Sequence, residues 1–375
     1  MRPYRIIISG GGTGGHIFPA IAIADTFRQR HPDAKILFVG ADNRMEMERV
    51  PKAGYEIVGL PVSGFDRSHK LKNIAVLFRL LKSLRMAKKI IRTFNPDIAV
   101  GVGGYASAPT LWAASSLGVS TLIQEQNSYA GITNKRLAKR AATICVAYEG
   151  MERFFPTDKI VVTGNPVRKE LETALEDKKA ALDYFQLQAD RKTLLLIGGS
   201  LGARTINRGM QNGLKRLLDA GIQIIWQTGK HYYADIRQLL EQVNTANRVW
   251  CADFITRMDY AYAAADLVVS RAGAGSVSEL CLLKKAAILI PSPNVAEDHQ
   301  TKNALAVASR GAAVVITDSD AEQLLADTIL NLIHDAAKLQ SLSEKIGLLA
   351  QRHSAERIVD EIEKLRVIFP SPCRP

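Results

Sequence analysis

Short apolar segments alternate with helical segments along almost the whole chain. Ile6-Ile7-Ile8 is a β-branched run typical of a buried strand, and residues 17–27 after it have the spacing of apolar positions of a helix. Such alternation predicts βαβ units and a parallel sheet covered on both faces. Further strands are expected at 35–40, 98–102, 121–124, 143–147 and 159–163 and, later in the chain, at 193–197, 222–226, 247–251, 267–270, 286–290 and 313–317.

The alternation is interrupted at Gly164-Asn165-Pro166, where we place a hinge, and it restarts after a charged helical segment, 167–184. A chain of 375 residues is also longer than one hydrophobic core usually supports. We therefore expect an α/β protein with two tandem, Rossmann-like, doubly wound parallel sheets. The expected domains are 1–164, 165–345 and a terminal segment, 346–375, whose helix at 355–368 could pack on either domain.

A glycine-rich loop follows the first strand, with glycines at positions 10–12, 14 and 15. A strand, a glycine turn and a helix start place backbone N–H groups at the positive end of a helix, which is a site for phosphate. The segment 194–203 repeats this arrangement, and 101–105 is a third glycine turn. Because ligands of such sheets collect beyond the carboxyl ends of the strands, we expect both loops to face a cleft between the domains.

Three features of these loops have two interpretations each. Gly10, Gly12 and Gly15 match the dinucleotide fingerprint of nicotinamide-binding proteins. In that fingerprint an acidic residue follows the glycines by ~20 residues, and Asp42 lies later than this, which disfavours a nicotinamide site. His16 is either a first-turn histidine that bonds the backbone or a general base beside a phosphate. Glu279 either accepts two adjacent sugar hydroxyls or is a first-turn carboxylate favoured by the helix dipole.

Positive charge is concentrated in the first half of the chain. The net charge is +12, and residues 1–168 contain 24 Lys and Arg against 12 Asp and Glu, whereas residues 169–375 contain 25 of each. An anionic partner is therefore expected: a membrane surface, a nucleic acid or a phosphorylated substrate. The segment 67–92 is basic, without acids, and has apolar residues at helical spacing, as in a helix on an anionic bilayer or a sheet-covering helix with solvated lysines. Those apolar residues are Ile74, Leu77, Phe78, Leu81 and Leu84.

Several classes of protein are disfavoured. The four cysteines are far apart, which predicts neither a zinc site nor a disulfide framework and fits a reducing cytoplasm. No apolar run approaches the ~20 residues that span a bilayer. Asp318-Ser319-Asp320 resembles a metal motif of sugar transferases, but its place before a helix favours an N-cap, so neither metal nor cofactor is indicated. Aromatic residues are sparse in the basic segment, which disfavours a non-catalytic nucleic-acid binder.

Seven motifs, taken in order, resemble those of the MurG family, bacterial transferases that move GlcNAc from UDP-GlcNAc to lipid I. The resemblance implies a GT-B fold, an acceptor-binding N-domain, a nucleotide-binding C-domain, inverting chemistry without an essential metal, and a peripheral place on the cytoplasmic face of the cell membrane. Another UDP-sugar enzyme of the same fold, either a UDP-GlcNAc 2-epimerase or a different UDP-sugar transferase, remains an alternative. The motifs are 11–16, 103–105, 125–127, 164–168, 198–203, 271–279 and 298–304.

The resemblance also implies a role for each matching residue. His16 is the candidate base for the acceptor 4-hydroxyl, with Glu125 as a competing or supporting candidate. The implied binding residues are Thr13, Gly14 and Gly15 for the donor or the lipid diphosphate, Asn127 for GlcNAc, Arg168 and Ser200 for the UDP phosphates, Ile255 for uracil through its backbone, Ala274, Gly275, Ser276, Val277 and Ser278 for the nucleotide, Glu279 for the ribose and Gln300 for the sugar hydroxyls.

Overall fold

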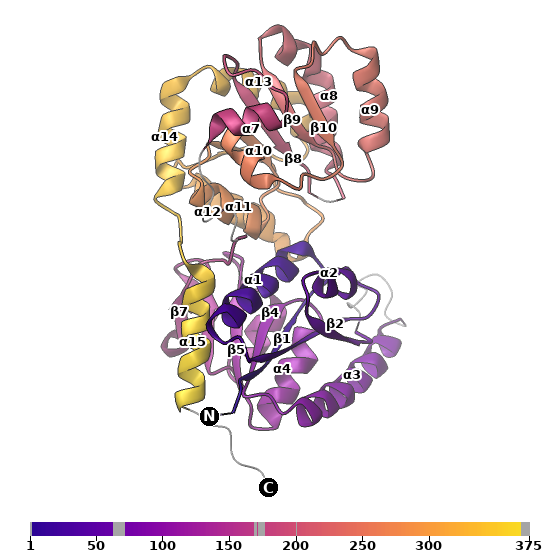
Figure 1. The fold of residues 1–375 in the computed structure, drawn as a ribbon, viewed down its shortest axis with the longest axis vertical. Coiled ribbons are helices and arrows are strands. Elements are labelled where there is room, and N and C mark those ends of the chain that lie inside the picture. Colours follow the sequence, from indigo (N-terminus) through magenta and orange to yellow (C-terminus); the bar gives the residue numbers. More distant parts are fainter. Residues whose placement is uncertain (1, 63–71, 169–170, 172–176, 200, 369–375) are drawn as a thin grey trace. The chain divides into compact units, whose positions relative to one another are not determined.

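The computed structural model describes residues 2–62, 72–168, 171, 177–199 and 201–368. The chain divides into two compact units (Figure 1): unit 1 comprises Met1–Arg168 with Gln351–Pro375, and unit 2 comprises Lys169–Ala350. Each unit contains its own parallel sheet with helices packed against it, so the expected α/β architecture is confirmed. The predicted hinge at 164–166 lies just before the first boundary between the units.

Seven parallel strands form the sheet in the described part of unit 1, in the order β3-β2-β1-β4-β5-β6-β7. Side chains of a strand alternate between its faces, so Ile6 and Ile8 pack on one side of the sheet and Ile7 on the other. The strand order reverses between β1 and β4, which makes the loop after β1 the expected ligand site. The strands are β1 (Arg5–Gly10), β2 (Lys35–Ala41), β3 (Glu56–Leu60), β4 (Ile98–Gly103), β5 (Ser120–Glu125), β6 (Thr143–Val146) and β7 (Ile160–Val162).

One strand of unit 1 was not predicted. β3 is a short edge strand, only partly buried, and Gly59 interrupts its apolar run. Its pattern is therefore too weak to separate it from a loop. The helical elements of unit 1 are α1 (Gly14–Arg30), α2 (Glu46–Lys52), α3 (Lys72–Phe94), α4 (Ser107–Ser116), α5 (Ile132–Leu137), α15 (Ser354–Ile368), η1 (Met151–Arg153) and η2 (Thr157–Lys159).

The described part of unit 2 contains a six-stranded parallel sheet in the order β10-β9-β8-β11-β12-β13. Its order reverses between β8 and β11, at the second glycine loop. Of the helix expected at 167–184, residues 178–184 form α7, and most of the segment before them lies outside the described residues. The elements are β8 (Thr193–Ile197), β9 (Gln223–Gln227), β10 (Val249–Ala252), β11 (Leu267–Ser270), β12 (Ala287–Leu289), β13 (Val314–Val315), α7 (Lys178–Tyr184), α8 (Arg204–Asp219), α9 (Tyr233–Gln242), α10 (Met258–Ala264), α11 (Ala274–Leu282), η3 (Ala296–Asp298), α12 (His299–Ala308), α13 (Ala321–Ile333) and α14 (Ala336–Gly347).

The last helix, α15, packs on unit 1, beside α1 (Figure 1). Ile358 and Ile362 are fully buried in the same hydrophobic cluster as Phe27 of α1. At the edge of this contact Arg30 pairs with Asp360, and the two side chains approach to 2.5 Å. The core of unit 1 is therefore completed by residues that follow unit 2 in the sequence.

The basic segment predicted at 67–92 forms α3 from Lys72 onward, and residues 67–71 lie outside the described ranges. Its inner face is made by Ala87 and Ile91, which pack on the sheet. Phe78 and Leu81 were expected in one apolar stripe, but they are 70% and 46% exposed. The helix thus both covers the sheet and presents apolar side chains outward. Within the described residues, no helix is long and apolar enough to cross a membrane.

Candidate active site

The glycine loop of unit 1 leads from β1 directly into the start of α1. Gly12 has φ +86°, a conformation that glycine adopts without strain. Thr13 is the N-cap, and its carbonyl accepts the N–H groups of His16 (3.1 Å) and Ile17 (3.2 Å). The first N–H groups of a helix lack an intrahelical acceptor, so Thr13, Gly14 and Gly15 lie where an anionic group is best stabilised.

A second glycine turn, after β4, lies in contact with the first. A Cβ atom at Gly104 would lie 2.3 Å from the carbonyl oxygen of Gly11, and one at Gly103 would lie 2.7 Å from Cδ2 of His16. Only residues without a side chain permit these approaches. The two turns therefore form one surface at the carboxyl ends of β1 and β4.

His16 lies in the first turn of α1, and the loop itself orients its ring. Nδ1 lies 3.0 Å from the carbonyl oxygen of Gly11 and 3.3 Å from Oγ1 of Thr13. A carbonyl oxygen can only accept, so Nδ1 carries the proton in that hydrogen bond. The neutral imidazole then has its lone pair on Nε2, which is the form a general base requires.

A buried carboxylate, that of Glu46, is hydrogen-bonded to the same loop. Glu46, the first residue of α2, is 0% exposed. Its Oε2 accepts the N–H of Gly12 (2.9 Å) and its Oε1 accepts the N–H of Ala41 (3.0 Å), which ties the loop to the end of β2. The side chain fills the space beside Gly11, where a Cβ atom would lie 2.1 Å from Oε1. Sequence reasoning missed Glu46, because no periodicity links it to the loop 34 residues earlier.

Glu125, at the end of β5, is buried and its two oxygens accept four N–H bonds. Oε1 accepts from the backbone N–H (3.0 Å) and side-chain amide (3.2 Å) of Asn127, and Oε2 accepts from the N–H of Gly131 (3.0 Å) and the amide of Asn134 (2.9 Å). These four hydrogen bonds hold the residues after β5 in one conformation. They position Asn127, the residue that the motif assigned to the sugar.

Arg168 belongs to unit 1 and lies near the start of α1. The segment before it is anchored by Asn165, whose amide donates to the carbonyl of Gln126 (2.9 Å) and whose oxygen accepts from Gln124 (3.0 Å). The guanidinium of Arg168 lies 5.4 Å from the ring centroid of Phe18. The charge is therefore held beside the first turn of α1.

Unit 2 contains a cavity of about 470 Å³ around its own glycine loop. The cavity lies at the carboxyl ends of β8, β11 and β12 and against the first turn of α8, so backbone N–H groups and the positive end of the helix face it. Ser200, the loop residue expected to hold a phosphate, lies outside the described residues. The lining residues are Gly198, Gly202, Ala203, Arg204, Thr205, Tyr232, Arg271, Ser292, Asn294, Gln300 and Asp318.

Arg271 places a positive charge in the cavity, and its guanidinium is held by several contacts. Its guanidinium pairs with Asp318 (2.5 Å) and bonds Oγ1 of Thr205 (3.1 Å) and the carbonyl of Ile290 (3.1 Å). The side chain is 17% exposed, so its charge is only partly screened by water. Arg271 belongs to a predicted motif but had been given no role, because its position after β11 does not show which way its side chain points.

The expected aspartate cap at 318–320 is wrong in detail. Asp320 occupies the N-cap position of α13, but its carboxylate accepts from Oγ1 of Thr317 (2.7 Å) instead of a helix N–H within the described structure. Asp318 braces Arg271. Across the described part of the chain, no group of three or more His, Cys, Asp or Glu residues is arranged to hold a metal ion.

Gln300 is the predicted sugar-binding residue that lines this cavity. Its Oε1 accepts the N–H of Ser292 (2.9 Å), which holds the side chain near the carboxyl end of β12. The turn before it places Glu297 and Asp298 at φ +56° and +51°. Non-glycine residues in this region cost about 1 kcal/mol or more each, and such strain is concentrated at functional sites.

The remaining predicted nucleotide residues lie in unit 2 but not among the residues lining the cavity. Glu279 is buried in α11 and accepts a hydrogen bond from Oη of Tyr262 (2.9 Å). Ile255 follows β10 and is fully buried, and its N–H donates to Oε1 of Gln227 (3.2 Å). The residues 274–278 form the first turns of α11, where Ala274 and Val277 are buried and Gly275, Ser276 and Ser278 are partly buried.

The two halves of the chain match the two domains of one enzyme family. Residues 6–146 match the glycosyltransferase family 28 N-terminal domain, and residues 193–362 match the glycosyltransferase family 28 C-terminal domain. The chain belongs to glycosyltransferase family 28. This membership confirms the family resemblance noted in the sequence and identifies the two sheets as the two halves of a GT-B fold.

Relatives within family 28 cover almost the whole chain. A protein of Parabacteroides distasonis is 66% identical over 97% of this chain and 99% of its own, and one of Bacteroides thetaiotaomicron is 58% identical over 97% and 98%. Both are named UDP-N-acetylglucosamine--N-acetylmuramyl-(pentapeptide) pyrophosphoryl-undecaprenol N-acetylglucosamine transferase.

Solved structures agree with the family 28 assignment. MurG of Acinetobacter baumannii is 29% identical, with a TM-score of 0.77 over 96% of this chain and 100% of its own. A UDP-N-acetylglucosamine 2-epimerase has a TM-score of 0.64 over 100% and 99% of the two chains, but only 14% identity, so it shares the fold alone.

Proposed function

We propose that this glycosyltransferase moves GlcNAc from UDP-GlcNAc to the 4-hydroxyl of MurNAc-(pentapeptide)-pyrophosphoryl-undecaprenol, which converts lipid I to lipid II in peptidoglycan synthesis. The observation that carries the proposal is the 66% identity, over nearly full length, to a relative named for this reaction. The two glycine loops support it, because both substrates contain a diphosphate and each loop suits one.

The donor binds to unit 2 in this proposal. The loop N–H groups, the first turn of α8 and Arg271 face the UDP diphosphate, and Gln300 bonds the hydroxyls of GlcNAc. Glu279 binds the ribose and the carbonyl of Ile255 meets the uracil. Asp318 pairs with Arg271 and orients its guanidinium, so the positive charge is preorganised for the diphosphate.

The acceptor binds to unit 1. Its diphosphate lies against the N–H groups at the start of α1, near Thr13, Gly14 and Gly15. Arg168 extends from unit 1 beside Phe18 of the same helix, and its charge serves the UDP phosphates. Asn127 bonds the GlcNAc being transferred. Glu125, with its four N–H donors, keeps Asn127 in place, which favours the supporting role for this carboxylate over the role of base.

His16 is the general base of the proposed reaction. The acceptor O4 attacks C1 of GlcNAc with inversion; the O4–C1 bond forms, the bond from C1 to the phosphate oxygen breaks, and the O4 proton passes to Nε2 of His16. UDP leaves with the bonding electrons, and its new charge is stabilised by the N–H groups and Arg271.

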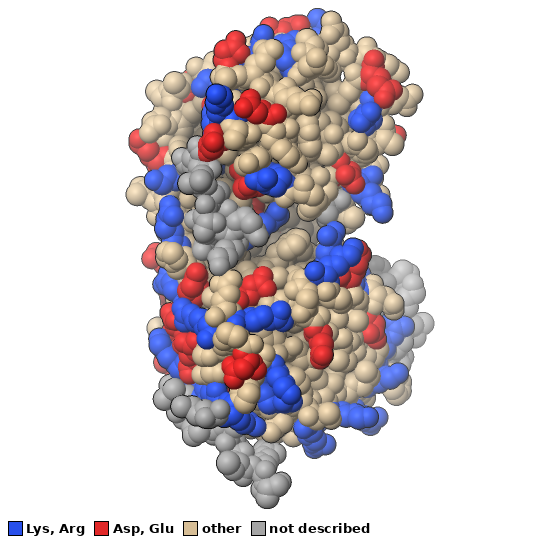
Figure 2. All heavy atoms as spheres, in the orientation of Figure 1, with Lys and Arg blue, Asp and Glu red and all other residues tan. Residues whose placement is uncertain are grey.

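Helix α3 and its basic surroundings dock unit 1 on the cytoplasmic face of the cell membrane. Phe78, Lys82, Arg85, Lys89 and Arg92 are exposed and follow one another at intervals of three and four residues, so they form one stripe on the helix. Figure 2 shows Lys and Arg along the lower right edge of unit 1, over α3. An apolar residue at one end of a basic stripe suits the headgroup layer of an anionic leaflet, where lipid I resides.

The test is transfer of labelled GlcNAc from UDP-GlcNAc to a short-chain lipid I analogue. We expect a disaccharide product with inverted configuration at the new glycosidic bond. UDP-GlcNAc incubated without acceptor provides the control, since an epimerase would act on the donor alone. Formation of an epimer, or no transfer to the analogue, would overturn the proposal.

A further inference from the structure

Unit 2 has a second recess, at the opposite edge of its sheet from the donor cavity. Lys192 directly precedes β8, Asp266 directly precedes β11 and Ala286 directly precedes β12, so the recess lies at the amino ends of the strands. The donor cavity lies at the carboxyl ends of the same three strands. Strands of three to five residues separate the two sites by roughly 10–16 Å. The second recess therefore cannot be part of the donor site.

The recess is strongly positive. Its volume is about 410 Å³, and the described residues that line it include four lysines and one acid, Asp266. Oδ2 of Asp266 accepts the N–H of Thr193 (2.8 Å), and Oδ1 pairs with Lys178 (2.7 Å) and more distantly with Lys192 (3.8 Å). One carboxylate thus faces two ammonium groups among four lysines, and a concave surface dominated by one charge sign focuses the field on its interior.

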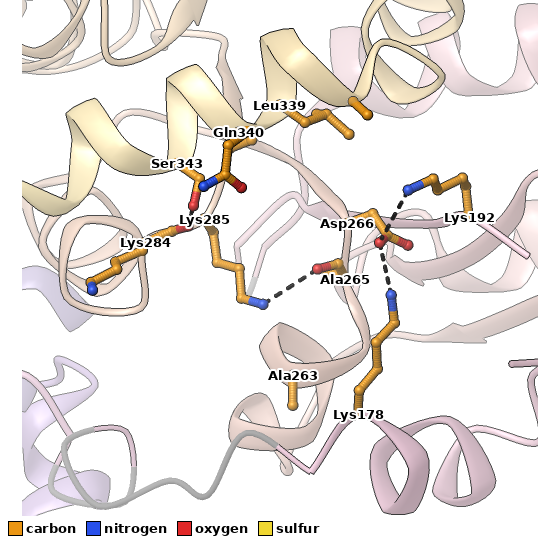
Figure 3. A pocket seen from close by; sticks show the side chains of 12 residues that line it. Lys178, Lys192, Ala263, Ala265, Asp266, Lys284, Lys285, Leu339, Gln340 and Ser343 are labelled. Carbon is orange, nitrogen blue, oxygen red and sulfur yellow. Dashed lines mark hydrogen bonds and ion pairs between the residues drawn. The ribbon is translucent and has the colours of Figure 1, made fainter.

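Three of the lysines face a common space. Figure 3 shows the ammonium groups of Lys178 and Lys192 directed toward Asp266, whereas that of Lys285 extends toward the carbonyl of Ala265, at 3.4 Å. Lys284 points away from them in the same view. Lys178 is in α7, Lys192 directly precedes β8 and Lys285 lies just before β12. Two of the three converging lysines therefore extend from the edge of the sheet.

We propose that this recess, which we call the lysine recess and define by Lys178, Lys192, Lys285 and Asp266, binds a phosphate group of a second ligand, separate from either substrate of the transfer. Ammonium groups are point donors that suit phosphate oxygens, and Asp266 holds two of them in place through ion pairs. A free phosphorylated metabolite and a phospholipid headgroup share this chemistry, and the volume accommodates either.

The test uses the full chain with saturating UDP, which occupies the donor cavity, and inorganic pyrophosphate as the probe in calorimetry. Lys192→Gln with Lys285→Gln should weaken pyrophosphate binding by about tenfold or more. Lys215→Gln is the matched control, because Lys215 is an exposed lysine of unit 2 outside the recess. Equal binding by the wild type, the double variant and the control would overturn the proposal.

A parallel measurement with phosphatidylglycerol and phosphatidylcholine vesicles separates the two sources of phosphate. Loss of binding to the anionic vesicles alone, in the double variant but not in Lys215→Gln, assigns the recess to a lipid headgroup. Loss of pyrophosphate binding alone assigns it to a soluble ligand. Transfer of GlcNAc to a soluble acceptor analogue should be unchanged in the double variant, so failure of this proposal is distinguishable from failure of the proposed function.

Discussion

In the site of unit 1, the side chains of His16 and Glu46 contact backbone groups of the glycine loop. The ring of His16 is oriented by the carbonyl of Gly11, and the carboxylate of Glu46 holds the N–H of Gly12. Both contacts involve the same short loop, so its backbone geometry and the chemistry of His16 are linked. Replacing either side chain should therefore affect catalysis, but in different kinetic constants.

His16→Ala should lower kcat by about 100-fold or more, because no other group of the loop can take the O4 proton. The KM for UDP-GlcNAc should remain within about twofold of the wild-type value, since the donor binds unit 2. His31→Ala, at the C-cap of the same helix, is the control, and its turnover should stay near wild type. Wild-type turnover in His16→Ala would exclude the histidine as the base.

Glu46→Gln should raise the KM for the lipid acceptor and leave the donor KM unchanged. Glutamine has one acceptor oxygen, so either Gly12 or Ala41 loses its partner, at a cost of about 1–3 kcal/mol in the ordering of the loop. Glu48→Gln, whose carboxylate pairs with Lys52 at the surface, is the matched control. Steady-state kinetics below the unfolding temperature provide the measurement, and equal acceptor KM values in both variants would contradict the role.

At the level of elements, the site of unit 1 depends on how closely two turns approach. The turn after β4 lies against the turn after β1 at Gly104. Gly150 has a similar φ, +77° against +86°, but a Cβ atom there would meet nothing within 4 Å. Substitutions at Gly104 and Gly150 therefore separate the cost of backbone strain from the cost of a steric clash.

Gly150→Ala should destabilise the protein by about 1 kcal/mol, the cost of a left-handed residue with a side chain. Gly104→Ala should cost at least about 2 kcal/mol more, because the added methyl group collides with the backbone of Gly11 and both turns must shift. Urea denaturation of the two variants gives the comparison. Equal losses of stability would mean that the turns separate easily.

The periodicity of the chain predicted most of these elements and the position of both loops, because buried parallel strands and glycine turns have strong local patterns. It did not predict β3, whose apolar run is short. Nor did it predict the roles of Glu46 or Arg271, because these depend on contacts between residues distant in sequence. The basic and apolar character of α3 was predicted from the sequence, but its division into a sheet-covering face and a face with exposed Phe78 required coordinates.

The stripe on α3 gives a prediction at the same level. Phe78→Ser combined with Lys82→Glu and Arg85→Glu should weaken binding to anionic vesicles by at least about tenfold, because each basic residue near the surface contributes about 1 kcal/mol. Lys215→Glu with Arg216→Glu makes the same change of charge on the exposed face of α8 and should have little effect. Vesicle sedimentation at low and high salt is the measurement. Binding that does not depend on salt would contradict an electrostatic contact.

At the scale of the whole molecule, the described residues of unit 1 and those of unit 2 form separate hydrophobic clusters, so each unit has a core of its own. Two cores of this kind are expected to unfold in separate steps, so a single free energy of unfolding does not describe the protein. Ligands and core substitutions can then be assigned to a unit by the transition that they move.

Ile362→Ala, which removes a fully buried side chain of α15, should destabilise one unfolding transition by about 2–4 kcal/mol. UDP at 100 times its Kd should stabilise the other transition by about 2.7 kcal/mol. Lys364→Ala, at the surface of the same helix, should change stability by less than about 1 kcal/mol. Calorimetry with and without UDP checks all three, and a shift of the same transition by UDP and Ile362→Ala would contradict the assignment.

The return of α15 to unit 1 affects the order in which the protein matures on the ribosome. Domains usually fold from the amino end as they emerge. Here a nascent chain that has emerged to residue 350 contains all of unit 2, but it lacks Ile358 and Ile362, which cover the α1 face of the first sheet. Unit 2, which is translated after most of unit 1, is thus the first unit that can fold completely, and the face of α1 that α15 covers stays exposed until residues 354–368 have emerged.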